Sequence, residues 1–395
     1  MPTQNFSGAR RRDAVVVGGR CAGSATAMLL AQRGYDVLLV DRATFPSDTL
    51  STHAIARSGV VQLHTWGLLD RLLDAGTPPL RSVAFHGDNG SIEMEVKMRH
   101  GVDAIVAPRR TVLDAMLLDE ARRSGVEVVT GVTATGVTRD DAGRVTGVTL
   151  RDHDDLAVDA RIVIGADGLK SRIARSVGSP IIRSRPATGA LHYGYFEGDW
   201  GPLEYFPGHR SFGGIFPTND GEACVWVSTP ASDAVEVRRD SDTLDEAFDR
   251  MLAGLQGDIR DRVGGTPPSG PIRGVMNLPN QFRQAHGSGW ALVGDAGYHR
   301  DAITGHGISD AFRDAALLAD WLDRAWKGTI DESKALAAYQ AERDEMSAEL
   351  FAVNEAMLRY PEGVELMETQ KKLSSAMERH AARVSARFDS GRIAA

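Results

Sequence analysis

The sequence predicts an α/β fold with a parallel sheet, a second, antiparallel sheet and C-terminal helices. Three observations lead to this prediction: a strand–turn–helix–strand pattern near the N-terminus, a later region of short aromatic strands, and helical periodicity from about residue 308 onward. The chain has 395 residues. This length suggests about two or three domains.

The N-terminal pattern is a Rossmann-like βαβ unit of about thirty residues. Ala14 to Val17 is a short apolar run that ends in glycines, as a buried parallel strand does. The stretch "AGSATAMLLAQRG" is rich in helix formers and ends at Gly34, a typical C-cap. The stretch "DVLLVDR" is a second apolar strand, with Asp41 at its end. We expect a parallel strand pair joined by this helix.

The turn of this unit comes close to the G-x-G-x-x-G pattern of dinucleotide-binding proteins. Gly18 permits a tight turn, and Gly23 lets the helix pack closely on the sheet. The backbone amides at the helix start can hold a pyrophosphate. The carboxylate of Asp41 can accept hydrogen bonds from ribose hydroxyls. The turn and the acid together predict a dinucleotide site.

Arg20 stands where the pattern has its middle glycine. An arginine fits there if its Cβ points away from the phosphates. We expect its guanidinium to lie near the diphosphate or over the mouth of the site, where it would favour negative charge. The alternative is a surface arginine that pairs with a nearby carboxylate. Its neighbour Cys21 is expected to be a small packing residue at the helix start.

The middle of the chain predicts a loop, a hairpin and a long helix. "FPSDTLSTHAI" (45–55) is a polar loop, and "SVAFHGDNGSIEMEV" (82–96) has the pattern of a hairpin. An amphipathic helix begins near residue 110 and runs into a strand, with Gly125 between them. "GTPPSGP" (265–271) is the clearest linker.

The region from about residue 185 to 275 is the aromatic part of the chain. Its strands alternate in the manner of an antiparallel sheet over which an apolar molecule can bind. Aromatic residues in strands are also common sheet-core residues, so about half of the candidates could serve packing alone. The candidate substrate wall consists of Tyr193, Tyr195, Phe206, Phe216 and Trp226.

Two further motifs follow buried strands. "IGADGLKSR" (164–172) contains Asp167 and Gly168. "VGDAGYHRDAITGHGISDAFRDAALLA" (293–319) has Asp295 at the end of its strand. Gly305 and Gly307 precede a long helix, where glycines let backbone amides approach a flat or anionic ligand.

The three motifs in this order resemble those of the FAD-dependent monooxygenases of the para-hydroxybenzoate hydroxylase type, which are related to geranylgeranyl reductases and flavin halogenases. The resemblance runs from about residue 13 to 325. It implies that the N-terminal turn binds the ADP half of FAD, that Asp295 holds the ribityl part, and that Gly305 to Ile308 lies by the flavin pyrimidine. The cofactor residues implied or predicted are Gly18, Arg20, Cys21, Ala22, Gly23, Asp41, Arg42, Arg110, Asp167, Asp295, Gly305, His306, Gly307 and Ile308.

The chain departs from the family pattern at three positions. Arg20 replaces a glycine, Ala302 stands where proline is usual, and Ser309 stands where asparagine is frequent. These departures bear on details of the flavin contacts and leave FAD as the expected cofactor.

The resemblance implies a flavin reaction, in which the cofactor carries the chemistry and the protein supplies orientation and water exclusion. We expect a monooxygenase that uses NAD(P)H and O₂ to oxygenate an apolar or aromatic small molecule through a C4a-hydroperoxyflavin. No second glycine fingerprint follows the first, so no separate NAD(P)H domain is expected. The candidate catalytic side chains are His53 and His306, although either could be an ordinary loop residue.

Alternative reactions on the same fold stay open. A reductase of prenyl double bonds uses the same FAD fold, and the aromatic strands could equally hold a lipid tail. A flavin halogenase is disfavoured, because the first lysine is Lys97 and the W-x-W-x-I-P pattern is absent. A non-catalytic FAD-binding protein is the remaining alternative.

The predicted organisation is an FAD-binding domain formed by residues 1–180 and 276–330, a substrate domain at 181–275, and a C-terminal helical region at 331–395. A net charge of -8 argues against nucleic acid as a partner. Two distant cysteines and the lack of a long apolar run favour a cytoplasmic protein without an integral membrane segment. We expect no metal at the His299 and His306 pair, and a monomer or homodimer.

Overall fold

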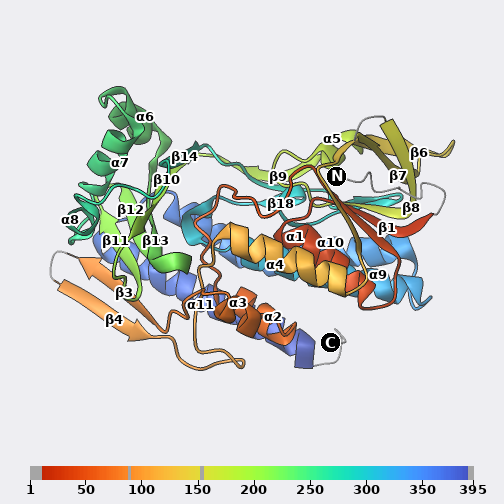
Figure 1. Ribbon diagram of the computed structural model, residues 1–395, viewed down its shortest axis with the longest axis horizontal. Helices are drawn as coiled ribbons and strands as arrows, with labels where there is room; N and C mark the ends of the chain where they lie inside the picture. Colours follow the sequence, from red (N-terminus) through yellow and green to blue (C-terminus); the bar gives the residue numbers. More distant parts are fainter. Residues whose placement is uncertain (1–10, 88–89, 152–154, 390–395) are drawn as a thin grey trace.

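The computed structural model describes residues 11–87, 90–151 and 155–389. The ends of the predicted first and last regions, residues 1–10 and 390–395, therefore lie outside the described residues. Two large sheets lie toward opposite ends of an elongated molecule, and α11 (Gly363–Asp389) extends from the second sheet to the helices below the first (Figure 1). The predicted α/β fold with a parallel sheet, antiparallel sheets and C-terminal helices is confirmed.

The first sheet is built on the predicted βαβ unit. Its central strands β8, β1, β2 and β5 run parallel, with β17 parallel to β8 at one side. In order, the strands are β16 (His286–Gly287), β17 (Trp290–Leu292), β8 (Asp155–Gly165), β1 (Arg12–Val17), β2 (Val37–Asp41) and β5 (Glu127–Thr130), with β7 (Val145–Arg151) paired antiparallel to β8, and β6 (Thr133–Arg139) paired to β7.

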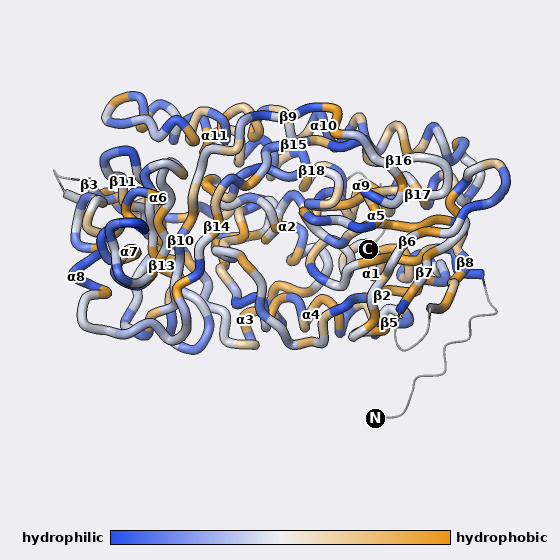
Figure 2. The backbone as a smooth tube through the Cα atoms, turned by 90° about the horizontal axis from the view of Figure 1, so that it is seen from above, coloured by the Kyte–Doolittle hydropathy of each residue, from blue (hydrophilic) through white to orange (hydrophobic). Residues whose placement is uncertain are grey.

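Both faces of this sheet are covered, which explains its continuous apolar strands. Val15, Val16 and Leu39 are fully buried. The helix α1 (Cys21–Ala31) packs between the sheet and its neighbours α4 (Arg110–Arg123) and α9 (Gly307–Trp326), so nearly all its residues are buried. Figure 2 shows apolar segments gathered along these strands and α1.

The second sheet has seven strands in the described part of the chain. In order, they are β14 (Arg273–Met276), β10 (Gly189–Glu197), β13 (Glu222–Pro230), β12 (Ser211–Pro217), β11 (Leu203–Gly208), β3 (Ser82–Gly87) and β4 (Gly90–Glu95). The predicted hairpin of β3 and β4 is confirmed, but it extends this second sheet. Residues within the predicted first domain therefore help to build the sheet of the second.

Short elements connect the two halves. The third sheet contains β18 (Tyr298–His299), β15 (Asn280–Arg283) and β9 (Ile181–Arg185). The other helices are α2 (Arg57–Thr65), α3 (Leu69–Asp74), α5 (Arg172–Ser176), α6 (Ala231–Arg239), α7 (Leu244–Leu252), α8 (Ile259–Val263) and α10 (Glu332–Met357), with short 3₁₀ turns η1 (Asn219–Gly221), η2 (Gly294–Ala296) and η3 (Ala302–Thr304). Among the described helices, none is long and apolar enough to cross a membrane.

Candidate functional site

The glycine turn after β1 leaves no room for side chains at its two outer glycines. Gly18 has a φ of +112°, and a Cβ there would lie 2.3 Å from the carbonyl oxygen of Ala166. A Cβ at Gly23 would lie 1.7 Å from the carbonyl oxygen of Gly18. The turn therefore brings the start of α1 close to the ends of β1 and β8, as the sequence pattern predicts.

Asp41 lies beside this turn at the end of β2. Its carboxylate accepts hydrogen bonds from the backbone amides of Gly19, at 2.6 Å, and Ala43, at 2.7 Å. The side chain is half-buried, and its neighbour Arg42 is exposed. Both side chains thus lie where an adenosine ribose could reach them.

The third motif meets the glycine turn in space. A Cβ at Gly294 would lie 2.7 Å from the Cβ of Ala22 and 3.7 Å from that of Ala311, so η2, α1 and α9 converge. Asp295 follows in η2 and is exposed. Its carboxylate is one of the acidic groups that raise the pKa of the buried Arg110.

The segment before α9 leaves open space in front of its backbone. Gly305 adopts a left-handed φ of +60°, and a Cβ at Gly305 or Gly307 would meet no atom within 4 Å. The N-terminal amides of α9 begin at Gly307. A backbone cradle of this kind, with the dipole of a 20-residue helix behind it, fits the flat, anionic end of a flavin.

Asp167 has a structural role in this arrangement. Its carboxylate accepts hydrogen bonds from the Ser171 hydroxyl, at 2.5 Å, and from the amides of Arg172 and Ile173, at 2.6 and 3.2 Å. These bonds fix the start of α5 behind the turn at Gly168, whose φ is +75°. Direct contact of Asp167 with FAD or NAD(P)H stays a prediction.

Arg20 pairs with a buried carboxylate rather than a surface one. Its guanidinium lies 2.5 Å from the carboxylate of Asp114 in α4. It also donates hydrogen bonds to Ser47 and Asp48 in the loop that follows β2. These contacts account for the arginine without a cofactor, so its contact with FAD stays a prediction.

Asp114 is the centre of a small buried cluster that sequence reasoning missed. Arg110 donates two hydrogen bonds to it, at 2.8 and 3.2 Å, and the Cys21 thiol lies 3.3 Å away. Burial lowers the pKa of Arg110, but the surrounding acidic groups outweigh it and raise the pKa overall. Burial raises the pKa of the Cys21 thiol, which therefore stays protonated and serves packing.

Four of the five candidate wall residues lie on one face of the second sheet. Tyr193, Tyr195, Phe216 and Trp226 form an aromatic face that turns toward the FAD-binding half, and all four are buried. Trp226 Nε1 has no hydrogen-bond partner among the described residues. We call this surface the aromatic face.

Phe206 lies on the opposite face, which corrects its assignment to the wall. It packs with Phe248 and Met251 of α7, and its ring stacks on His86 at 4.2 Å. Successive strand residues point to opposite faces, so Tyr205 and Phe206 cannot both face the same side. Phe206 is therefore a core residue beneath the helices.

His53 meets the aromatic face from the loop of residues 45–55. Its Nε2 is hydrogen-bonded to the Tyr195 hydroxyl, and the two rings stack with centroids 5.3 Å apart. Arg109, another residue the sequence analysis missed, lies on the ring of Tyr195 at 3.6 Å. Burial, with Arg110 and Arg109 nearby, lowers the pKa of His53 well below its ordinary value, so the imidazole is neutral.

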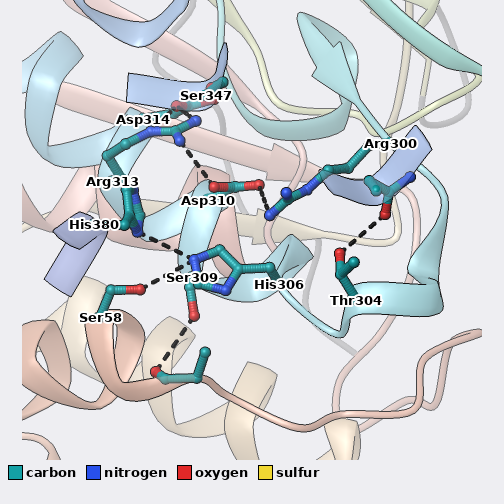
Figure 3. Close-up of polar contacts among 12 residues, drawn as sticks. Ser58, Arg300, Thr304, His306, Ser309, Asp310, Arg313, Asp314, Ser347 and His380 are labelled. Atoms are coloured by element: carbon teal, nitrogen blue, oxygen red, sulfur yellow. Dashed lines mark hydrogen bonds and ion pairs between the residues drawn. The ribbon is translucent and has the colours of Figure 1, made fainter. Parts of the chain in front are cut away.

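His306 is the N-cap residue of α9, and its side chain points toward α2 and α11 (Figure 3). Its Nε2 lies 3.2 Å from the Ser58 hydroxyl and 3.1 Å from Nδ1 of His380. Burial lowers the pKa of His306 to about 3 and that of His380 well below its ordinary value. The contacts found for the His306 side chain thus indicate a role in helix packing.

A buried ion network lies behind this pair. Asp310 pairs with Arg300 at 2.9 Å and with Arg313 at 2.8 Å (Figure 3). The side chains of His306, Asp310 and His380 bring possible metal ligands within 4.8 Å of one another. The two guanidiniums already occupy both oxygens of Asp310 and would repel a dication, so this cluster is better described as an ion network.

The comparison with protein families decides which cofactor this geometry serves. The family model "FAD binding domain" matches residues 11–353. The chain belongs to the FAD-binding domain family. It is an FAD-dependent oxidoreductase, and the residues around the glycine turn, η2 and the start of α9 are its candidate FAD site.

Relatives of known name fall into more than one group. The chain is 30% identical over 325 residues to menaquinone reductase of Mycobacterium tuberculosis, covering 79% of this chain and 76% of the relative. It is 27% identical over 385 residues to digeranylgeranylglycerophospholipid reductase 1 of Methanopyrus kandleri, covering 92% and 94%. The structure is similar to PqsL, a probable FAD-dependent monooxygenase from Pseudomonas aeruginosa, with a TM-score of 0.77, 22% identity and coverage of 93% and 100%.

Proposed function

We propose that this oxidoreductase reduces a carbon–carbon double bond in an elongated, isoprenoid-type substrate that lies on the aromatic face. One observation carries the proposal: a row of apolar residues crosses six strands in register. The row consists of Tyr193, Trp226, Gly214, Tyr205, Phe85 and Ile92, each paired directly with the next. Directly paired residues share a sheet face, so the row is continuous.

The glycine in the row makes room for its neighbour. A Cβ at Gly214 would lie 2.8 Å from Nε1 of Trp226, so the indole lies over the glycine. Five strand spacings of about 4.8 Å give the row a length of about 24 Å. No charged residue interrupts it, which suits a long hydrocarbon chain better than a compact polar ring.

Exposure increases along the row from the FAD-binding half outward. Tyr193 is 1% exposed and Trp226 is 3% exposed, whereas Ile92 on the edge strand β4 is 67% exposed. The row thus has a covered end near the candidate FAD site and an open end at the sheet edge. A substrate could place its reacting bond at the covered end while its tail or head group extends to the edge.

The named relatives support the same substrate class. The two reductases above act, by their names, on menaquinone and on a digeranylgeranyl lipid. The monooxygenase expected from the sequence shares the cofactor and the aromatic face. The monooxygenase is kept as a second candidate, because oxygen transfer also requires a site without water, and the buried aromatic face would provide one.

A halogenase remains disfavoured. Each of the six lysines of the chain is exposed, and the aromatic face contains none. The first lysine in the sequence, Lys97, lies beyond the edge strand β4.

FAD reduced by NAD(P)H would supply a hydride to one alkene carbon, and a proton that originates from solvent would complete the other carbon. The residues of the chain would orient the reactants. Asp41 would hold the ribose, and the amides from Gly305 to Ile308 would hold the flavin pyrimidine and favour its reduced anion. Tyr193 and Trp226 would keep the alkene against the flavin and away from water. NAD(P)H is the proposed reductant, bound transiently because the sequence contains a single glycine fingerprint.

Anaerobic turnover separates the two candidate reactions. FAD-loaded protein is incubated with NADH or NADPH and either a menaquinone or a geranylgeranyl lipid, with and without O₂. The reductase predicts products that have gained two hydrogens, formed equally well without O₂. A product that has gained one oxygen, formed only with O₂, would establish the monooxygenase instead.

A further inference from the structure

The loop of residues 45–55 covers the inner end of the aromatic face. The amide of Ser51 donates a hydrogen bond of 3.2 Å to the Tyr193 hydroxyl, and His53 is hydrogen-bonded to Tyr195. The carboxylate of Asp48 lies 3.6 Å from Arg273. We call residues 45–55 the cover loop. The contacts of Asp48, Ser51 and His53 thus hold the C-terminal part of the cover loop on β10 and β14.

The cover loop contributes little backbone pairing of its own. Residues 44–51 make no backbone–backbone hydrogen bond with the described part of the chain. His53 has a left-handed φ of +58°, a conformation that a non-glycine residue keeps only when surrounding contacts impose it. The position of the loop therefore depends on side chains.

Arg20 supplies side-chain contacts to the N-terminal part of the cover loop, next to the glycine turn. Its guanidinium donates to the Ser47 carbonyl at 3.3 Å, the Ser47 hydroxyl at 3.1 Å and the Asp48 carbonyl at 3.1 Å. It also lies 5.5 Å from the ring centroid of Phe45. A glycine at this position could make none of these contacts.

Asp114 holds the guanidinium in the orientation that these contacts need. Its side chain is fully buried in α4 and lies 2.5 Å from the nearest guanidinium nitrogen. A planar guanidinium with several donors can bind a carboxylate on one side and loop oxygens on the other, which an ammonium group cannot match.

We propose that Arg20 is a positioning residue that latches the cover loop over the inner end of the aromatic face. The latch ties the loop to the turn predicted to hold the FAD diphosphate. Tyr193 and Tyr195 are buried and bonded to the loop while it is closed, so the loop must lift for a substrate to reach them. This last step rests on the proposed function, whereas the latch itself does not.

The test compares Arg20→Gly with Arg20→Lys in FAD-loaded protein. Glycine restores the usual turn and should retain FAD, while lysine keeps a positive charge beside Asp114 but loses the forked contacts with the loop. Quenching of the flavin fluorescence by iodide measures access to the site and needs no substrate. We expect the quenching constant to rise severalfold in both variants, with FAD content near that of the parent.

Arg239→Gly is the matched control, because Arg239 is an exposed arginine at the end of α6 that pairs with Asp240. It should leave quenching unchanged. Parent-like quenching in FAD-loaded Arg20→Gly would overturn the latch. Parent-like quenching in Arg20→Lys alone would also overturn it, because Arg20 would then only neutralise Asp114.

Kinetics give a second readout once a substrate is known. Lifting of the loop should change KM more than kcat in both Arg20 variants. If iodide quenching increases while KM stays at the parent value, the result supports the latch but contradicts the placement of the substrate on the aromatic face.

Discussion

The two faces of the second sheet are covered in different ways. One face packs against α7 and α8, and its apolar residues, including Phe206 and Val225, interlock with side chains such as Phe248. The aromatic face is covered near the FAD-binding half by the cover loop, whose backbone is irregular. Helices make a permanent core, whereas an irregular loop held by side chains can open.

The largest expected effect is on the helix-covered face. Phe206→Ala should destabilise the protein by about 3–5 kcal/mol, because the packed helices cannot fill the cavity. Urea unfolding should show this loss, while KM of the remaining folded enzyme should stay at the parent value. A change in KM without a loss of stability would place Phe206 on the substrate side.

The contact of α11 with α2 and α9 should make the stability of the protein depend on pH. His306 has a folded-state pKa of about 3, against 6.5 as its ordinary value. Between these values the unfolded chain binds more protons than the folded one, so stability falls as pH decreases below 6.5 and is retained above it. The slope should approach about 1.4 kcal/mol per pH unit for each buried neutral histidine.

Thermal melts of His380→Gln test this slope. The variant should lose stability less steeply than the parent as the pH falls from about 6.5 to about 5. His209→Gln, which removes an exposed histidine far from α9, is the control for the loss of a histidine as such. Identical slopes in all three proteins would mean that His380 does not stay neutral in the folded state.

Trp226→Phe should have a smaller effect on stability than Phe206→Ala. We expect a loss on the order of 1 kcal/mol, because phenylalanine keeps most of the ring contacts of Trp226 and removes only part of its volume. KM for an isoprenoid substrate should rise, because Trp226 lies at the covered end of the row, next to Tyr193. The comparison of the two faces would fail if Trp226→Phe cost as much stability as Phe206→Ala and left KM unchanged.

The smallest effect on stability is expected at the open end of the row. Ile92→Ser lies on the exposed edge strand β4, so its effect should stay within about 0.5 kcal/mol. KM should rise for a long isoprenoid substrate and not for a short one, which would end before the edge. An equal change in KM for the long and the short substrate would show that the long substrate does not extend along the row to Ile92.

Local patterns were sufficient to predict the βαβ unit and the glycine turn after β1. Gly18 and Gly23 are required by contacts within one turn and its adjoining strand, so the spacing alone revealed the βαβ unit. The end of β2 placed Asp41 beside that turn, as expected. Interactions of this kind depend on few residues, which lie close together in the sequence or at the ends of paired strands.

Long-range partners could not be predicted in the same way. Asp114, which orients Arg20, lies far along the chain on a helix that looked merely amphipathic. Strand alternation shows that Tyr205 and Phe206 point to opposite faces, but it does not show which face the helices cover. The side chain of His306 depends on His380, whose position follows from the packing of α11.

Photo-crosslinking tests the central claim most directly. An isoprenoid analogue carrying a diazirine is bound to the FAD-loaded protein, irradiated and located by mass spectrometry of peptides. The account predicts labels on β10 and β13 around Tyr193 and Trp226, with further labels at β4 for a longer analogue, and competition by unlabelled isoprenoid. Competable labels confined to α7 and α8 would contradict it, because the substrate would then lie on the helix-covered face.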